Sequence, residues 1–295
     1  MNNQLRYFGV LCKEYLSSPL CYMSVVLFVL LCAFGNSADV GGSNYSVLEL
    51  ITDRELYRQA CTFMQCSSYI LTLRYDAMPW FSVVVPVITA FPALMIYEQN
   101  SGGICTSILS RIKKQNYCGS LFITAFLSGF LIAMLGIVLY AVLMLFYFPS
   151  ITAFDDEILL SFYGSTMLER FVPLLKKGIN CCFVCGVFPV LTVSIYNIVH
   201  DRFLAMTFPM MLQYISLKCS ILYASWLYSD PSRASDRLLN LFHLLFPSNC
   251  MSHYSFWENN LQLPFLCFFI IIGALLVVLY IIFERLIRLS VGGRI

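Results

Sequence analysis

Few residues of this chain have the types and spacing that catalysis or metal binding requires. Cys182 and Cys185 form a C-x-x-C pair, but the pair lies inside an apolar run, where cysteine acts as a small apolar residue. His243, Cys250 and His253 lack the closely spaced ligand pair that is typical of zinc sites. We therefore expect no metal site and no cofactor in this chain.

The motifs of the common enzyme classes are missing as well. The sequence contains no G-x-x-x-x-G-K-[ST] phosphate loop and no H-E-x-x-H or G-x-S-x-G motif. An intramembrane hydrolase would need acids or histidines facing inward within the apolar runs, and there are none except at their ends. Lys218 lies in such a run, where snorkelling of its amine to the polar boundary is favoured over a substrate or relay role. The chain is not expected to be an enzyme.

Composition instead indicates an integral membrane protein. Of the 295 residues, 59% are hydrophobic and 12% are charged, against about 25% charged residues in soluble domains. The charges are clustered and leave long apolar gaps, which is typical of membrane spans. The 13 cysteines lie mostly in these gaps, so no disulfide framework is indicated, and no basic stripe suggests nucleic acid.

We predict a single all-α transmembrane domain over residues 1–295, with six transmembrane helices. The predicted spans cover residues 20–35, 79–96, 121–148, 179–199, 203–227 and 264–283. The third span is longer than the ~30 Å of hydrocarbon requires, so it must tilt or project. Its Ala125, Gly129 and Ala133 recur every four residues, which permits close contact with another helix, more often within one subunit than between subunits.

A polar stretch at residues 97–120 separates the second and third spans. After Gly102 and Gly103 break the backbone, Ile104, Ile108 and Ile112 recur every four residues, which predicts a short amphipathic helix. A helix this short is marginal by itself in water. Its apolar stripe therefore needs a partner, either a neighbouring span or another protein.

Residues 2–17 form a second amphipathic segment. Leu5, Phe8, Cys12 and Tyr15 share one face, together with Leu16. We expect an interfacial helix that lies along the membrane before the first span. A signal peptide is the competing interpretation, but the charged lead-in is too long for one.

Two longer polar segments are expected on the opposite side of the membrane. In residues 36–78, Thr52 and Glu55 have the spacing of a capping box, which predicts a surface helix with Thr52 as its N-cap. Residues 229–263 contain an apolar piece that is too short to span, so we expect re-entrant or surface helices there. Both segments are too long for plain connectors, and we expect them to pack together.

Six spans place both termini on the same side of the membrane. The basic residues of that side lie in short segments close to the span ends, as the positive-inside rule requires, and acidic residues concentrate on the other side. We therefore expect a multi-pass protein of the cell (plasma) membrane with both termini in the cytoplasm.

This layout resembles the membrane subunits of ABC-2 type transporters over the whole chain. That family carries an N-terminal interfacial helix, six spans, a cytoplasmic coupling helix between spans two and three, and re-entrant outer helices before span six. The local match is an acid after the second span, two glycines, a basic residue in the short helix and a tyrosine before the third span: Glu98, Gly102, Gly103, Arg111 and Tyr117. Gly-Gly stands where the family often has Gly-Thr, and the family's proline is absent.

The resemblance implies a permease subunit that pairs with a second copy or a similar permease, and with separate ATP-binding subunits that hold ATP and magnesium. It assigns ATPase coupling to Glu98, Gly102, Gly103, Ile104, Ile108, Arg111 and Ile112, and the interfacial helix to Leu5, Phe8, Cys12 and Tyr15. The expected function is an ABC exporter that moves an amphipathic or hydrophobic cargo (peptide, drug or lipid) out of the cell. The alternative is a non-transporting membrane scaffold or accessory subunit that binds a partner ATPase.

Overall fold

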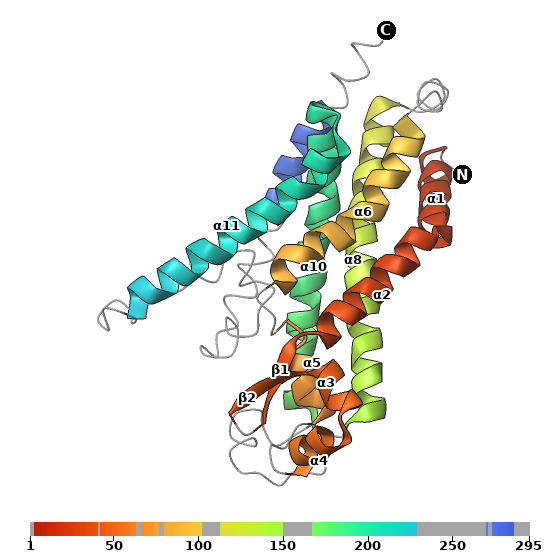
Figure 1. Ribbon diagram of the computed structural model, residues 1–295. Helices are drawn as coiled ribbons and strands as arrows, with labels where there is room; N and C mark the ends of the chain where they lie inside the picture. Colours follow the sequence, from red (N-terminus) through yellow and green to blue (C-terminus); the bar gives the residue numbers. More distant parts are fainter. Residues whose placement is uncertain are drawn as a thin grey trace.

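The computed structural model describes residues 3–40, 42–62, 67–76, 80–101, 113–149, 167–228, 270 and 273–285. In chain order its elements are α1 (Asn3–Ser17), α2 (Pro19–Ala33), β1 (Asn36–Val40), β2 (Ser43–Ser46), α3 (Val47–Thr52), α4 (Arg54–Thr62), α5 (Ser68–Leu73), α6 (Phe81–Ser101), α8 (Lys114–Tyr147), α10 (Met167–Val199) and α11 (Arg202–Tyr228). Figure 1 shows the long helices α6, α8 and α10 packed together, with the strands and the short helices α3, α4 and α5 gathered at one end.

Three helices in the described part of the chain are long and apolar enough to cross a membrane. The qualifying stretches are Phe81–Glu98 in α6, Gln115–Tyr147 in α8 and Leu174–Val199 in α10. Helices α1 and α2 meet at a bend of 56° and pass the same test together, as one broken span or as a re-entrant loop. The described residues therefore hold three or four candidate spans, which supports membrane insertion without reaching the predicted six.

The structure describes most of the fifth predicted span and only part of the sixth. Helix α11 forms one continuous helix over the predicted fifth span, but it is not among the three qualifying helices. Of the predicted sixth span, residue 270 and residues 273–283 are described and helical. The predicted re-entrant helices at residues 229–263 lie outside the described residues.

Helices α8 and α10 make the most extensive contact between elements in the described structure. A Cβ added at Gly129 of α8 would lie 2.3 Å from the Cys185 carbonyl oxygen and 2.7 Å from Pro189 Cγ, both in α10. A Cβ added at Gly186 of α10 would lie 2.7 Å from the Phe126 ring of α8. Each helix thus places a glycine against the other, and the close contact predicted at Gly129 lies within one chain.

The segment before α6 is not the simple surface helix that we predicted. Strands β1 and β2 pair in antiparallel fashion, with Val40 opposite Ser43, and Gly42 has a φ of +85°, which glycine adopts without steric cost. Three short helices follow the strands. The chain is therefore not all-α, because two short polar strands joined at a Gly-Gly pair form a hairpin that helical periodicity does not reveal.

The predicted capping box at Thr52 is wrong in position. The Ser46 hydroxyl accepts a hydrogen bond from the Glu49 N–H at 3.2 Å, and the Glu49 carboxylate accepts one from the Ser46 N–H at 2.7 Å, so the box caps α3. Helix α4 is capped by Asp53, whose Oδ1 accepts from the Glu55 N–H at 2.9 Å. Both Ser46 and Thr52 have a glutamate three residues later, so the spacing by itself does not choose between them.

The short elements pack onto the end of α8, which we call the capped end of the bundle. Tyr57 of α4 donates its hydroxyl proton to the Tyr147 carbonyl at 2.5 Å and packs its ring against Phe148, with ring centroids 5.4 Å apart. The Ser68 N–H donates to the Pro149 carbonyl at 3.0 Å. This segment is therefore part of the packed bundle instead of a helix lying on the membrane face.

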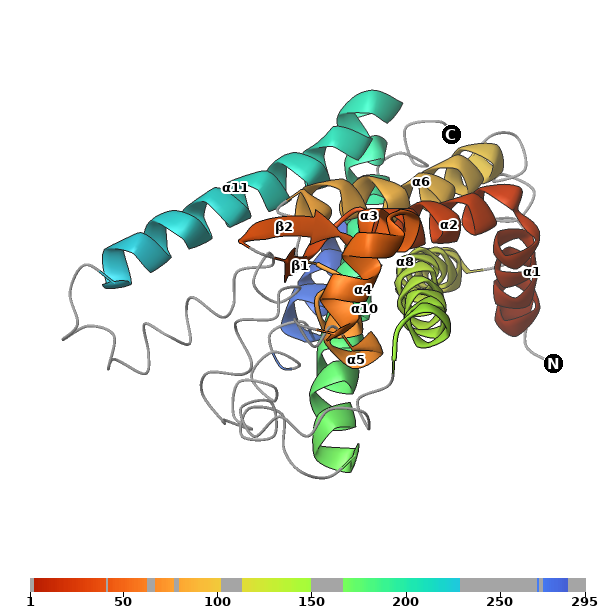
Figure 2. The ribbon, with the colours of Figure 1, turned by 60° about the horizontal axis from the view of Figure 1, so that its bottom comes forward.

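Helix α11 extends obliquely away from the bundle in both views (Figures 1 and 2). It contacts α6 and α10, and its buried face includes Ala205, Gln213, Ser216 and Ser220. Many of its large apolar side chains outside that face are exposed, with Phe203 75% exposed. An apolar surface of this kind is typical of a contact with lipid or with another protein.

Candidate functional site

The predicted coupling stretch joins two helices at the end of the bundle opposite the capped end. Helix α6 ends there at Ser101, α8 begins there at Lys114, and the turn between α10 and α11 lies beside them (Figure 1). We call this the junction end. Of the predicted coupling residues, Glu98 is described; the others lie outside the described residues, namely Gly102, Gly103, Ile104, Ile108, Arg111 and Ile112.

Polar and aromatic contacts attach the last turns of α6 to α10 and α11. Glu98 Oε1 lies 2.7 Å from Arg202 Nε, and the Glu98 side chain is only 9% exposed. The Tyr97 hydroxyl donates to Asn197 Oδ1 at 2.5 Å, and the Tyr97 ring packs edge-on against Tyr196 with centroids 6.1 Å apart. The predicted coupling stretch therefore continues into a helix end that is tied to two other helices.

The turn from α10 to α11 is short and tightly defined. His200 has a φ of +57°, a left-handed conformation that is uncommon for residues other than glycine. Asp201 Oδ1 accepts a hydrogen bond from the Leu204 N–H at 3.0 Å, which caps the start of α11. This geometry puts Arg202 in the first turn of α11, where Glu98 reaches it.

Helix α1 packs against the same end through three buried side chains. Tyr7, Leu11 and Tyr15 join a buried cluster that also contains residues of α6 and α8. The Tyr7 ring stacks on Tyr117 of α8, with centroids 5.6 Å apart. The apolar face of α1 is therefore used within the chain.

The buried face of α1 is rotated from the one that we predicted. Tyr15 is buried, Phe8 and Cys12 are half-buried, and Leu16 is exposed; the Leu5 side chain lies outside the described residues. The predicted face did not include Tyr7 and Leu11, which the structure buries. A tyrosine ring is apolar and packs in a core while its hydroxyl stays polar, so Tyr7 can belong to the buried face. Contact with α8 and α6 takes up a face that we expected to rest on the membrane.

A buried ion pair at the capped end was missed by the sequence analysis. Lys177 Nζ of α10 lies 2.5 Å from Asp76 Oδ1, and the two side chains are 4% and 7% exposed. The same amine donates to the Leu73 carbonyl and lies 4.6 Å from the centroid of the Tyr75 ring, which is a cation–π geometry. In the sequence, this site is indicated only by a lysine at the edge of an apolar run. Its partner Asp76 lies 101 residues away, so no local spacing pairs the two residues.

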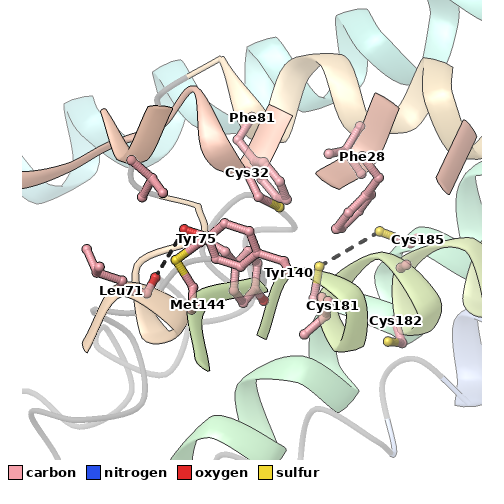
Figure 3. Close-up of a cluster of buried hydrophobic side chains, with 14 of the residues drawn as sticks. Phe28, Cys32, Leu71, Tyr75, Phe81, Tyr140, Met144, Cys181, Cys182 and Cys185 are labelled. Atoms are coloured by element: carbon pink, nitrogen blue, oxygen red, sulfur yellow. Dashed lines mark hydrogen bonds between the residues drawn. The ribbon is translucent and has the colours of Figure 1, made fainter. Parts of the chain in front are cut away.

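The ion pair borders the buried cluster shown in Figure 3. The Tyr75 ring packs against Phe81, which packs edge-on against Phe28 of α2, with centroids 5.6 and 5.5 Å apart. Cys181 and Cys185 place their sulfur atoms 3.9 Å apart as free thiols. Burial raises the pKa of the Tyr75 hydroxyl well above its ordinary value, so this hydroxyl stays neutral at physiological pH.

The thiols of this cluster act as packing groups. Cys182 and Cys185 of the C-x-x-C pair are buried among apolar side chains, as expected for small apolar residues. Among the described residues, no three His, Cys, Asp or Glu side chains are grouped so that they could hold a metal ion. His243, Cys250 and His253 lie outside the described residues.

Comparisons with protein-family models, with curated proteins and with solved structures found no match.

Proposed function

We propose that this chain is the membrane permease subunit of an ABC exporter and carries an amphipathic or hydrophobic cargo out of the cell. It acts with a second copy of itself or with a similar permease. Separate ATP-binding subunits hold ATP and magnesium and hydrolyse the nucleotide. Both termini and the connection between α6 and α8 face the cytoplasm in this proposal.

The observation that carries the proposal is the convergence of several elements at the junction end. Helix α1, the ends of α6 and α8 and the α10–α11 turn meet there, and Tyr97 and Glu98 tie α6 to the turn. An ATPase that pressed on residues 102–113 would move a helix end that is attached to α10 and α11. A chain that draws on a separate motor needs such a contiguous set of contacts to transmit the change.

The cargo class follows from the side chains of the helices. The spans are rich in phenylalanine, leucine, tyrosine and methionine and carry few charges. Ion paths through a membrane are normally lined by polar and charged side chains within the spans. The predicted spans offer few such groups to a bare ion. The composition favours an amphipathic or hydrophobic molecule as cargo.

The coupling stretch can be tested with a matched pair of variants, Ile108→Asp and Ser107→Asp. In the predicted helix Ile108 faces the ATPase and Ser107 faces away. An unpaired charge buried in an interface costs about 3–5 kcal/mol, so Ile108→Asp should lose the co-purified ATPase or leave it uncoupled while the permease still inserts. The Ser107→Asp variant should keep both properties, and normal ATPase binding and transport in Ile108→Asp would contradict the proposal.

Reconstitution in vesicles separates the exporter from the scaffold alternative. An exporter should raise the rate of ATP hydrolysis when cargo is added, and Arg111→Ala should weaken that response. A scaffold would bind the ATPase with no change in hydrolysis for any cargo. The measurement is ATP turnover with and without a fluorescent amphiphile, together with accumulation of that amphiphile across the membrane.

A further inference from the structure

The last described turns of α6 contact α10 and α11 through two adjacent residues. Tyr97 donates its hydroxyl proton to Asn197 Oδ1 of α10 at 2.5 Å. Glu98 Oε1 lies 2.7 Å from Arg202 Nε of α11. Adjacent residues of a helix point about 100° apart, so one turn of α6 uses separate side chains for the two helices. A rotation or shift of this turn would therefore change its contacts with both helices.

The end of α10 that receives the Tyr97 contact is itself fixed by hydrogen bonds. Asn197 donates from its Nδ2 to the Val193 carbonyl at 2.8 Å, which orients its Oδ1 as the acceptor for Tyr97. The His200 N–H donates to the Tyr196 carbonyl at 2.9 Å. The end of α10 is therefore hydrogen-bonded up to the turn that leads directly into α11.

The start of α11 depends on the ion pair more than on apolar packing. Phe203 and Leu204 are 75% and 53% exposed, and the first buried side chain of the helix is Ala205, which buries little apolar surface. The Glu98 side chain is only 9% exposed, and a charge buried to that degree needs a partner of opposite charge. The position of the start of α11 beside α6 is therefore set largely by Arg202.

We propose that Arg202 and Asn197 are positioning residues, which carry a movement of α6 to α11 and α10 when the partner ATPase acts on residues 102–113. The inference rests on the proposed function and extends it, since neither residue belongs to the predicted coupling stretch. With both contacts in place, the ends of α6, α10 and α11 move together. Without them, the ATPase still binds and hydrolyses ATP, but its movement does not reach α11.

The ion pair can be tested with Arg202→Gln in the full-length chain, copurified with its ATPase and reconstituted in vesicles. The Arg202 side chain is 64% exposed, so the substitution disturbs no packed core. The amount of a fluorescent amphiphile moved per ATP hydrolysed should fall about two- to thirtyfold, as expected when one contact of a coupling network is lost. ATPase binding should stay at the wild-type level. Lys218→Gln removes an exposed positive charge from the same helix and is the control that should keep the wild-type ratio.

The hydrogen bond can be tested with Tyr97→Phe. This variant keeps the ring that packs against Tyr196 and removes only the hydroxyl that reaches Asn197. It should lower the amount of amphiphile moved per ATP with little change in melting temperature. Tyr140→Phe removes a buried hydroxyl at the capped end, where the Leu71 carbonyl accepts its proton at 3.4 Å, and should leave the ratio unchanged.

Exchange of the two charges separates transmission from simple stabilisation. Arg202→Glu places two carboxylates together and should lower the amount of amphiphile moved per ATP at least as much as Arg202→Gln. Adding Glu98→Arg to that variant restores a pair of opposite charges and should recover most of the lost ratio. Melting temperature and ATPase binding are measured for every variant in parallel.

Three results would overturn the proposal. Wild-type transport per ATP in both Arg202→Gln and Tyr97→Phe would show that neither contact transmits movement. A ratio that falls only together with ATPase binding or melting temperature would show that the contacts only stabilise the fold. In both cases the wild-type chain still couples transport to hydrolysis, and the exporter function stands. A wild-type chain that neither binds an ATPase nor moves the amphiphile would overturn the exporter function and this inference with it.

Discussion

Lys177 and Asp76 neutralise each other in a place that water hardly reaches. A lysine amine or carboxylate buried without a partner is strongly unfavourable, whereas a matched pair is tolerated. The Leu73 carbonyl and the Tyr75 ring add further stabilisation of the amine. This pair therefore holds the segment after α5 against α10.

We predict that Lys177→Met destabilises the protein by about 3–5 kcal/mol, because it removes the lysine that neutralises the buried Asp76 carboxylate. The double variant Lys177→Met with Asp76→Leu removes both charges and should recover most of the loss. Thermal unfolding in detergent measures both effects. Leu175→Met, two positions earlier in α10 and exposed, is the control and should change stability little. Equal losses in the single and double variants would contradict the ion-pair account.

Glu49 provides a pH-dependent contribution at the capped end. The Ser46 backbone N–H and hydroxyl both donate to its carboxylate, and these hydrogen bonds lower the pKa of Glu49 in the folded chain. The carboxylate therefore stabilises α3 fully above its unfolded pKa of about 4.3. That contribution is lost as the pH falls through the lowered folded pKa.

We predict that the protection of the α3 amides against hydrogen exchange, relative to their intrinsic exchange rates, decreases below about pH 4. A Glu49→Gln variant can still accept the Ser46 hydrogen bond but does not titrate, so its exchange protection should not show this acid-dependent loss. Exchange rates of the α3 amides, compared with those of α8 across the same pH range, provide the measurement. An identical pH profile in both proteins would show that another group is responsible.

At the scale of elements, the contact between α8 and α10 depends on a glycine that no larger residue can replace without movement. The atoms that a side chain at Gly129 would meet are the backbone carbonyl of Cys185 and the ring of Pro189. Neither atom belongs to a flexible side chain. Any added carbon must therefore push the two helices apart.

We predict that Gly129→Ala destabilises the bundle by about 1–3 kcal/mol through overpacking. Gly119→Ala in the same helix is a matched control, since the nearest atom to its added carbon would be the Tyr280 hydroxyl oxygen at 3.9 Å. The control should be neutral or slightly stabilising, because alanine favours helix over glycine. Melting temperatures in one detergent would show the difference, and equal values would contradict the packing explanation.

At the scale of the whole molecule, the exposed apolar surface of α11 matters most. Phe203, Leu222 and Met211 are among the large apolar side chains that the described chain leaves uncovered. Lipid covers part of such a surface, and a second permease would cover another part. If the chain is an exporter subunit, its transport path is formed between two membrane subunits.

We therefore predict that the detergent-solubilised complex contains two permease chains, either two copies of this 33.6 kDa chain or one copy and a similar permease. Native mass spectrometry counts them directly. A complex with one permease and a bound, active ATPase would contradict the paired arrangement. The Lys177→Met variant is not suitable for this count, because its folding is already expected to be weakened.

The long helices could be predicted from the sequence because their information is local. Apolar runs long enough to cross the hydrocarbon, as in residues 121–148, require helices whose backbone hydrogen bonds are satisfied within each segment. The small residues of α8 also identified a close-packing face, and Gly129 lies on it. The same local information marked residues 2–17 as amphipathic.

Partners that are far apart in the sequence were decided only by the tertiary structure. The spacing of residues did not identify Asp76 as the partner of Lys177, Arg202 as the partner of Glu98, or the true cap of α4 at Asp53. It also misplaced the buried face of α1, because the choice between Leu16 and Tyr7 depends on which surface of α8 lies opposite. Helical periodicity is set by neighbours within four residues, whereas a buried charge or ring is stabilised by whatever the packed chain brings next to it.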